Sequence, residues 1–167
     1  MVLSTLHTND SVGAVNRLVN MGIEPYLVAA SLVAALAQRL VRRICKHCKV
    51  EDTEISRRVR AEIADTLGIQ AEDVKAWKGQ GCLECDHTGY RGRVAIYEFF
   101  LLDEEIQDMV SNHVGTGELR KAAIERGMRT LRQDGWEKVN DGATSIEEVQ
   151  RITSTFNISY DIGELDE

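Results

Sequence analysis

Cys45-Lys46-His47-Cys48 and Cys82-Leu83-Glu84-Cys85 contain the four cysteines of this 167-residue chain. In a C-x-x-C turn two thiolates can point at one ion, and two such turns complete a tetrahedron of ligands. The sequence shows no signal-peptide pattern, so we expect a reducing compartment, where paired cysteines favour metal ligation over disulfides. We therefore predict one structural zinc site whose metal ligands are Cys45, Cys48, Cys82 and Cys85.

Two other interpretations of the cysteines remain open at this point. Four buried thiols without a metal are one, although two paired turns rarely arise by chance. A redox C-x-x-C is the other, but one pair would suffice for that chemistry. His47 and His87 could replace a cysteine as ligands, and we expect them instead to be exposed turn residues.

Residues 45–91 are predicted to form an inserted module bracketed by the two cysteine pairs. Its middle carries apolar residues spaced by four, which indicates an amphipathic helix. These residues are Ile55, Val59, Ile63 and Leu67. Gly81 and Gly89 flank the second pair and give the backbone freedom for tight turns.

The sequence before the module predicts a mixture of strands and helices. Residues 2–6 are a short apolar run typical of a buried strand. Asp10 can cap a helix that ends near Met21. Pro25 can begin a second helix through Ala37, which is apolar all round and is expected to be buried. Residues 40–44 are predicted to be a short strand.

After the module, residues 93–100 are predicted to be a strand, and the rest of the chain is predicted to be helical. The expected helices begin at Asp103, at Thr116, near Leu131 and at the capping box Ser145–Glu148. The acidic tail, residues 154–167, is expected to fray.

Composition excludes some classes of protein. The net charge is −7, so the chain lacks the excess of basic residues that is typical of a nucleic-acid-binding protein. The most apolar run, residues 25–37, falls short of the roughly 20 residues that a membrane-spanning helix needs. We therefore expect neither a nucleic-acid partner nor a membrane span.

Several stretches, taken in order, resemble the C-terminal part of the assembly ATPases of type II secretion and type IV pilus systems. They are Leu3–Asp10, which resembles the His box of that family, Ala37–Cys45, Gly89–Glu98, Gly127–Leu131 with Asp134-Gly135, and Glu147–Arg151. The tetracysteine pattern favours the secretion and pilus-extension branches of the family over the retraction ATPases.

The resemblance implies a fold class: the α/β remnant of a RecA-like P-loop ATPase core, mostly helical, with an inserted tetracysteine zinc module. It divides the chain into residues 1–44 of the core, the module at 45–91, a strand with a helical bundle at 92–153, and the acidic flexible tail at 154–167. It implies a homohexamer in the cytoplasm, peripheral at the inner membrane and docked on platform proteins, that powers secretion or pilus extension.

The nucleotide machinery of that family is incomplete in this sequence. A P-loop needs G-x-x-x-x-G-K-[ST], and the chain contains no Gly-Lys dipeptide. We therefore expect a C-terminal fragment that does not hydrolyse ATP alone, while ATP and Mg²⁺ belong to the full-length parent. The resemblance assigns His7 to the nucleotide site as a catalytic residue near the terminal phosphate, with Thr8 assisting. Without the resemblance, His7 would be interpreted as a polar loop residue.

One interpretation from another class remains: a stand-alone, zinc-stapled adaptor that binds protein or nucleic acid. The acidic balance disfavours its nucleic-acid version.

Overall fold

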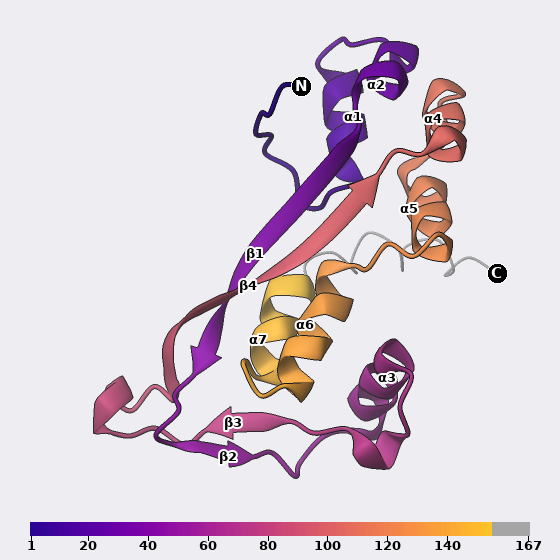
Figure 1. Ribbon diagram of the computed structural model, residues 1–167. Helices are drawn as coiled ribbons and strands as arrows, with labels where there is room; N and C mark the ends of the chain where they lie inside the picture. The colour runs from indigo at the N-terminus through magenta and orange to yellow at the C-terminus, as the bar shows by residue number, and fades with distance from the viewer. Residues whose placement is uncertain (155–167) are drawn as a thin grey trace, which may run out of the picture. The chain divides into compact units, whose positions relative to one another are not determined.

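The structure, a computed structural model, describes residues 1–154 of the chain. These residues form a mixed α/β fold with two two-stranded sheets, β1 with β4 and β2 with β3 (Figure 1). In chain order the helices and strands are α1 (Gly13–Asn20), α2 (Pro25–Ser31), β1 (Ala34–Ile44), β2 (Lys49–Glu51), α3 (Arg57–Leu67), β3 (Trp77–Gly79), β4 (Tyr90–Leu101), α4 (Glu104–Ser111), α5 (Thr116–Glu125), α6 (Leu131–Asn140) and α7 (Ile146–Thr153). The mixed fold class predicted from the sequence is confirmed.

The described chain forms two compact units. Unit 1 contains Met1–Gln38 and Tyr97–Thr130, and unit 2 contains Arg39–Ile96 and the described residues from Leu131 onwards. Each unit is therefore built from two separate stretches of chain. The domain boundaries predicted from the sequence stay a prediction.

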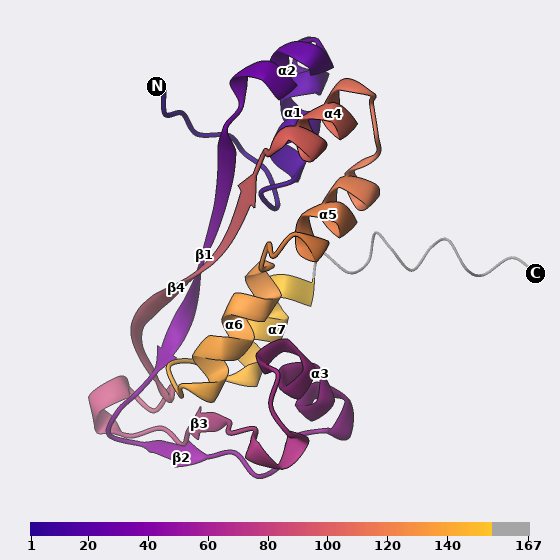
Figure 2. The same ribbon diagram turned by 45° about the vertical axis from the view of Figure 1, so that its right-hand side comes forward.

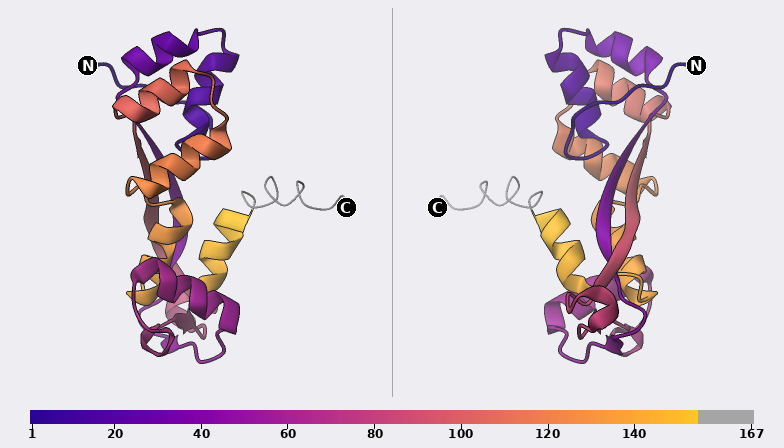
Figure 3. Two further views of the ribbon diagram at one scale, coloured as in Figure 1. Left: turned by 90° about the vertical axis from the view of Figure 1, so that its right-hand side faces the viewer. Right: turned by 90° about the vertical axis from the view of Figure 1, so that its left-hand side faces the viewer.

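Unit 1 has an aliphatic core between its helices and one end of the long strands. Helix α2 packs against α1 and α4, and α4 packs against α5 (Figure 3). Phe100 of β4 is fully buried in this core. Asp103 begins α4 as predicted, because its side chain accepts a hydrogen bond from the backbone N–H of Ile106 (3.1 Å).

Unit 2 has a second core, in which α6 packs against both α7 and α3 (Figure 2). The fully buried Trp136 lies in it with Ile63, Val139 and Val149. Helix α3 confirms the predicted amphipathic helix, and Gly68 ends it in a left-handed conformation.

Two predictions about the beginning of the chain are wrong. Residues 2–6 form no strand and are exposed, because no neighbouring strand supplies backbone partners to them among the described residues. The helix that starts at Pro25 ends at Ser31 rather than Ala37, and β1 begins at Ala34. Pairing with β4 outweighs the high helix propensity of the alanines in this stretch.

The strands and helices after the module agree with the sequence. β4 covers the predicted strand at residues 93–100, and four helices follow it within the described part of the chain, which ends at residue 154. In Figures 1 and 2 the arrows of β1 and β4 lie side by side and point in opposite directions. The predicted acidic tail lies, from residue 155 onwards, outside the described residues. None of the helices within residues 1–154 combines the length and apolarity needed to cross a membrane.

Candidate metal centre

The two C-x-x-C turns are brought together by the short ribbon of β2 and β3. β2 pairs with β3 antiparallel, with Lys49 opposite Gly79. Cys48 directly precedes that pair, and its carbonyl accepts a hydrogen bond from the N–H of Gln80 (3.0 Å). The ribbon therefore sets the first cysteine pair beside the segment that leads into the second.

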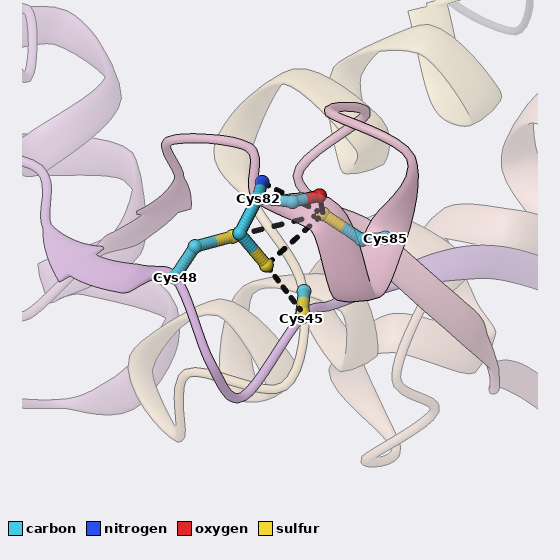
Figure 4. A group of neighbouring side chains, drawn as sticks. All are labelled: Cys45, Cys48, Cys82 and Cys85. Carbon is cyan, nitrogen blue, oxygen red and sulfur yellow. Dashed lines mark hydrogen bonds between the residues drawn. The ribbon is translucent and has the colours of Figure 1, made fainter.

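All four sulfur atoms converge on one point (Figure 4). The Sγ atoms of Cys45 and Cys82 are 3.9 Å apart, those of Cys48 and Cys85 3.9 Å, and those of Cys82 and Cys85 3.7 Å. All lie within 4.8 Å of one another. Metal–sulfur bonds of about 2.3 Å in a tetrahedron place neighbouring sulfurs about 3.8 Å apart. The spacing therefore fits a four-thiolate metal site, and it is far from the roughly 2.05 Å of a disulfide bond.

Backbone N–H groups point at one of these sulfurs. Cys85 Sγ accepts hydrogen bonds from the N–H groups of Cys82 (3.3 Å) and Gly89 (3.3 Å). Burial alone would raise the pKa of the Cys85 thiol, but these donors stabilise the thiolate and lower the pKa to about 6. Burial raises the pKa of Cys82 to about 11. Cys85 is thus better prepared than Cys82 to enter the site as a thiolate.

Two glycines are required where the chain passes close to itself beside the cysteines. A Cβ on Gly79 would lie 2.1 Å from the carbonyl oxygen of Gly89, and one on Gly89 would lie 2.6 Å from that of Gly79. The same Gly89 carbonyl accepts a hydrogen bond from the N–H of Cys45 (2.9 Å). This crossing holds the two turns together, and it leaves no space for a side chain.

His47 and His87 are both exposed, as the sequence predicted for turn residues. The group of side chains able to share a metal, within residues 1–154, consists of the four cysteines alone. Neither histidine is needed to complete a tetrahedral set.

The predicted nucleotide residues lie in unit 1, whereas the cysteines lie in unit 2. His7 is exposed in the irregular segment before α1. Thr8 is partly buried, and its hydroxyl donates to the backbone carbonyl of Asp10 (2.9 Å). The nucleotide roles of His7 and Thr8 stay predictions.

The sequence did not predict how the chain beside the metal site is anchored to α7. Glu148 is fully buried and accepts hydrogen bonds from the backbone N–H (2.8 Å) and the guanidinium (2.7 Å) of Arg42. Arg151 donates two more, each of 2.9 Å. Burial alone would raise the pKa of Glu148, but these donors lower it to about 2. Arg42 lies three residues before Cys45, near the end of β1, so this carboxylate anchors the strand that leads into the cysteine cluster.

The capping box predicted for α7 is half confirmed. Ser145 accepts a hydrogen bond from the N–H of Glu148 (3.3 Å), as predicted. The side chain of Glu148 binds the arginines instead of returning to the backbone at Ser145. Three charged donors from the guanidinium groups of Arg42 and Arg151 outcompete one backbone N–H for the buried carboxylate.

A second buried carboxylate that sequence reasoning missed is Glu98 of β4, which is 2% exposed. It accepts hydrogen bonds from the backbone N–H (3.0 Å) and the hydroxyl (2.6 Å) of Ser11. The sequence did contain a signal for this site, because Glu98 lies in a strand that is otherwise rich in apolar residues. A charged residue in a buried strand is rarely found without a partner, so a polar partner could have been expected.

Comparison with known proteins identifies the family to which this chain belongs. The family described as type II/IV secretion system protein matches residues 1–151. The chain therefore belongs to that family, and the resemblance noted in the sequence is confirmed.

Individual relatives are similar to the chain across most of its length. It is 43% identical over 153 residues to the type II secretion system protein HxcR of Pseudomonas aeruginosa, covering 92% of this chain. It is 43% identical over 152 residues to the type IV pilus assembly ATPase PilB of Thermus thermophilus, covering 89% of this chain. It is 43% identical over 153 residues to the type II secretion system ATPase E of Vibrio cholerae, covering 92% of this chain.

The chain spans only a minor part of those relatives. The matched share is 28% of the Pseudomonas protein, 16% of the Thermus protein and 29% of the Vibrio protein.

Proposed function

We propose that this chain is the zinc-stapled, C-terminal part of an ATPase that powers type II protein secretion or type IV pilus extension. The observation that carries the proposal is the match of residues 1–151 to the secretion family, together with relatives at 43% identity that are named as ATPases of these machines.

The intact protein, in this proposal, has a RecA-like core that binds ATP and Mg²⁺ and assembles as a homohexamer. It is cytoplasmic and peripheral at the inner membrane, where it acts on platform proteins of the secretion or pilus machine. His7 is the catalytic candidate in the chain: it approaches the terminal phosphate of ATP, and Thr8 assists it. Support for these roles comes from the His-box resemblance and from the irregular, partly exposed segment that contains both residues.

The metal in this proposal is a structural zinc ion held by Cys45, Cys48, Cys82 and Cys85. The sulfur separations of 3.7 to 3.9 Å support a tetrahedral site. A four-thiolate site is closed, so zinc supplies cross-linking of the two turns rather than catalysis. The cysteines, the Gly79–Gly89 crossing and the N–H groups on Cys85 hold and orient the ligands.

Metal analysis of the purified protein tests the zinc assignment. We expect one zinc ion per chain by mass spectrometry, and Cys82→Ser is expected to lose it along with secretion or pilus output of the intact protein. His47→Ala is the matched control, because it alters an exposed residue of the first turn without touching a sulfur. Full zinc content in the Cys82→Ser protein would show that the four sulfurs do not hold the ion.

ATP hydrolysis assays test the proposal that the intact protein is an active ATPase and that this chain alone is not. The 167-residue chain contains no phosphate-binding loop motif, so it is expected to show no ATP hydrolysis alone. The intact protein is expected to hydrolyse ATP, and His7→Ala is expected to lower its kcat on the order of 100-fold, as loss of a group that stabilises charge in the transition state does. Turnover by the 167-residue chain alone would overturn this assignment, and an unchanged kcat in His7→Ala would remove His7 from the site.

A further inference from the structure

A buried polar network in unit 1 joins the start of α1 to β4 and α5. Arg120 of α5 pairs through Nη2 with Asp10 (2.6 Å) and through Nη1 with Glu98 (3.3 Å). Glu98 in turn accepts both hydrogen bonds of Ser11. One guanidinium thus connects two carboxylates that lie 88 positions apart in sequence, Asp10 and Glu98.

Asp10 and Ser11 continue directly from the segment that contains His7 and Thr8. The other carboxylate oxygen of Asp10 accepts a hydrogen bond from the N–H of Gly13 (2.7 Å), and the Asp10 carbonyl accepts one from Thr8 (2.9 Å). Asp10 therefore uses both its side chain and its backbone to fix the turn between His7 and α1.

Because this network is largely shielded from water, its side chains are restricted to a single geometry. The side chains of Asp10 and Arg120 are 19% and 17% exposed, and that of Glu98 is 2% exposed. A buried carboxylate needs its donors, because an unpaired charge is strongly destabilising in a protein interior. Arginine fits this position because its planar guanidinium can donate hydrogen bonds to two carboxylates at fixed angles, whereas the lysine ammonium is a single point charge. The start of α1 is consequently held to one position relative to α5 within unit 1.

The stability of unit 1 does not by itself explain why Asp10, Glu98 and Arg120 form a network of ion pairs. Replacing a buried ion network by apolar side chains of similar volume is often neutral or stabilising. What the network adds is a defined position for the chain at Asp10 and Ser11, next to the candidate catalytic residue.

We propose that Arg120 and Glu98 are positioning residues that set the segment His7–Asp10 for its work on nucleotide, acting through Asp10 and Ser11. This inference rests on the proposed function for the role of His7. Through Arg120, α5 is the helix that holds this segment in place.

Hydrogen exchange of the intact protein tests the positioning step without any enzymatic assay. In Arg120→Met, the amide protons of Ser11 and Gly13 are expected to exchange about tenfold faster, because the carboxylates that accept their hydrogen bonds lose the charged donors of Arg120 that hold them in place. Asp10→Asn keeps an oxygen for Gly13 and removes the ion pair, so it is the milder variant if Arg120→Met does not fold. Arg126→Met is the matched control, because Arg126 is the arginine at the end of α5 and binds the exposed carboxylates of Asp103 and Glu105.

A double-mutant cycle tests the consequence for catalysis. Arg120→Met alone is expected to lower kcat of the intact protein on the order of tenfold with KM for ATP little changed, since an interaction made in the transition state is lost. In the His7→Ala background the same change is expected to have almost no further effect, because both act through one segment. Arg120→Lys is expected to restore part of the kcat, and Arg126→Met is expected to leave kcat unchanged in both backgrounds.

The outcomes separate this inference from the proposed function. If Ser11 and Gly13 keep their protection in both Arg120→Met and Asp10→Asn, the network does not position the segment, whatever His7 does. If Arg120→Met lowers kcat by the same factor with and without His7, its role is general stability and the inference is overturned. If His7→Ala leaves kcat unchanged while Ser11 loses protection in Arg120→Met, the proposed nucleotide role of His7 fails and the inference that rests on it is overturned too.

Discussion

The buried carboxylate of Glu148 makes the stability of unit 2 depend on pH in a way that can be calculated. Its pKa in the folded protein is about 2, because donors from Arg151 and Arg42 outweigh burial. An ordinary glutamate in an unfolded chain has a pKa of about 4.3. At neutral pH this difference of roughly 2.3 pKa units stabilises the fold by about 3 kcal/mol.

The sign follows from the direction of the shift. A carboxyl whose pKa is depressed by folding contributes its full stabilisation above pH values near 4.3, and it loses that contribution as the pH falls toward 2. At pH 3 only about 1.4 kcal/mol of the 3 kcal/mol remains. The charged or titratable groups that face Glu148 are Arg42 of β1, Arg151 of α7 and Tyr90 of β4, and none of them titrates in this range.

Urea unfolding followed by tryptophan fluorescence measures this effect, because Trp77 and Trp136 both lie in unit 2. Glu148→Gln is compared with the unmodified protein at pH 7, 5, 4 and 3, at one fixed zinc concentration. The gap in unfolding free energy between the two proteins is expected to shrink by about 1.7 kcal/mol from pH 7 to pH 3. The same series with zinc removed from both proteins separates zinc loss in acid from the titration of Glu148.

Glu147→Gln is the control, because Glu147 is the exposed neighbour on the same turn of α7. Its gap from the unmodified protein is expected to stay near zero at every pH. A Glu148→Gln curve that runs parallel to the unmodified protein from pH 7 to pH 3 would refute the reasoning.

Three further predictions concern the metal site and the helix packing in unit 2. Removing metal with a chelator is expected to raise amide exchange in residues 45–51 and 77–89 while unit 1 keeps its protection, and equal loosening of both units would contradict it. Gly89→Ala is expected to lower zinc affinity by at least tenfold in a competition titration, because its Cβ would lie 2.6 Å from the Gly79 carbonyl oxygen. Gly92→Ala is the control: Gly92 also has a positive φ, but its Cβ would meet no neighbour within 4 Å, so a smaller loss of zinc affinity is expected. Gly135→Ala is expected to lower the free energy of unfolding by about 1 to 3 kcal/mol, because its Cβ would lie 2.7 Å from Val149 Cγ1. Gly117→Ala is the control and is expected to be neutral or stabilising, because its Cβ would meet nothing within 4 Å. Equal effects of the two substitutions on the free energy of unfolding would contradict the packing argument.

Local patterns predicted the parts of this chain that are governed by nearby residues. The cysteine turns, the stripe of α3 and the caps at Asp103 and Ser145 all depend on interactions within a few residues. The convergence of the four sulfurs was also predictable, because two C-x-x-C turns have few other uses.

The failures lie where distant residues decide the outcome. The stretch Ala34–Ala37 looks helical by composition, and its pairing with β4 makes it a strand. Residues 2–6 look like a strand, but a strand needs a partner that the described residues do not supply. The partners of Glu98 and Glu148 come from 87 and 106 positions away, at Ser11 and Arg42, a separation that no local pattern reports.

The cysteine cluster is best understood together with Arg42, which lies on β1 three residues before Cys45 and is bound by the buried carboxylate of Glu148 on α7. Arg42 is bound by Glu148 through both its backbone and its side chain, and its carbonyl accepts a hydrogen bond from Thr144 (2.8 Å). The next residue but one, Ile44, donates its N–H to the carbonyl of Ala143 (3.0 Å). The chain thus enters Cys45 already fixed to the turn between α6 and α7. A metal held by the four cysteines would therefore join a segment that hydrogen bonds already fix to α7 and to the turn between α6 and α7.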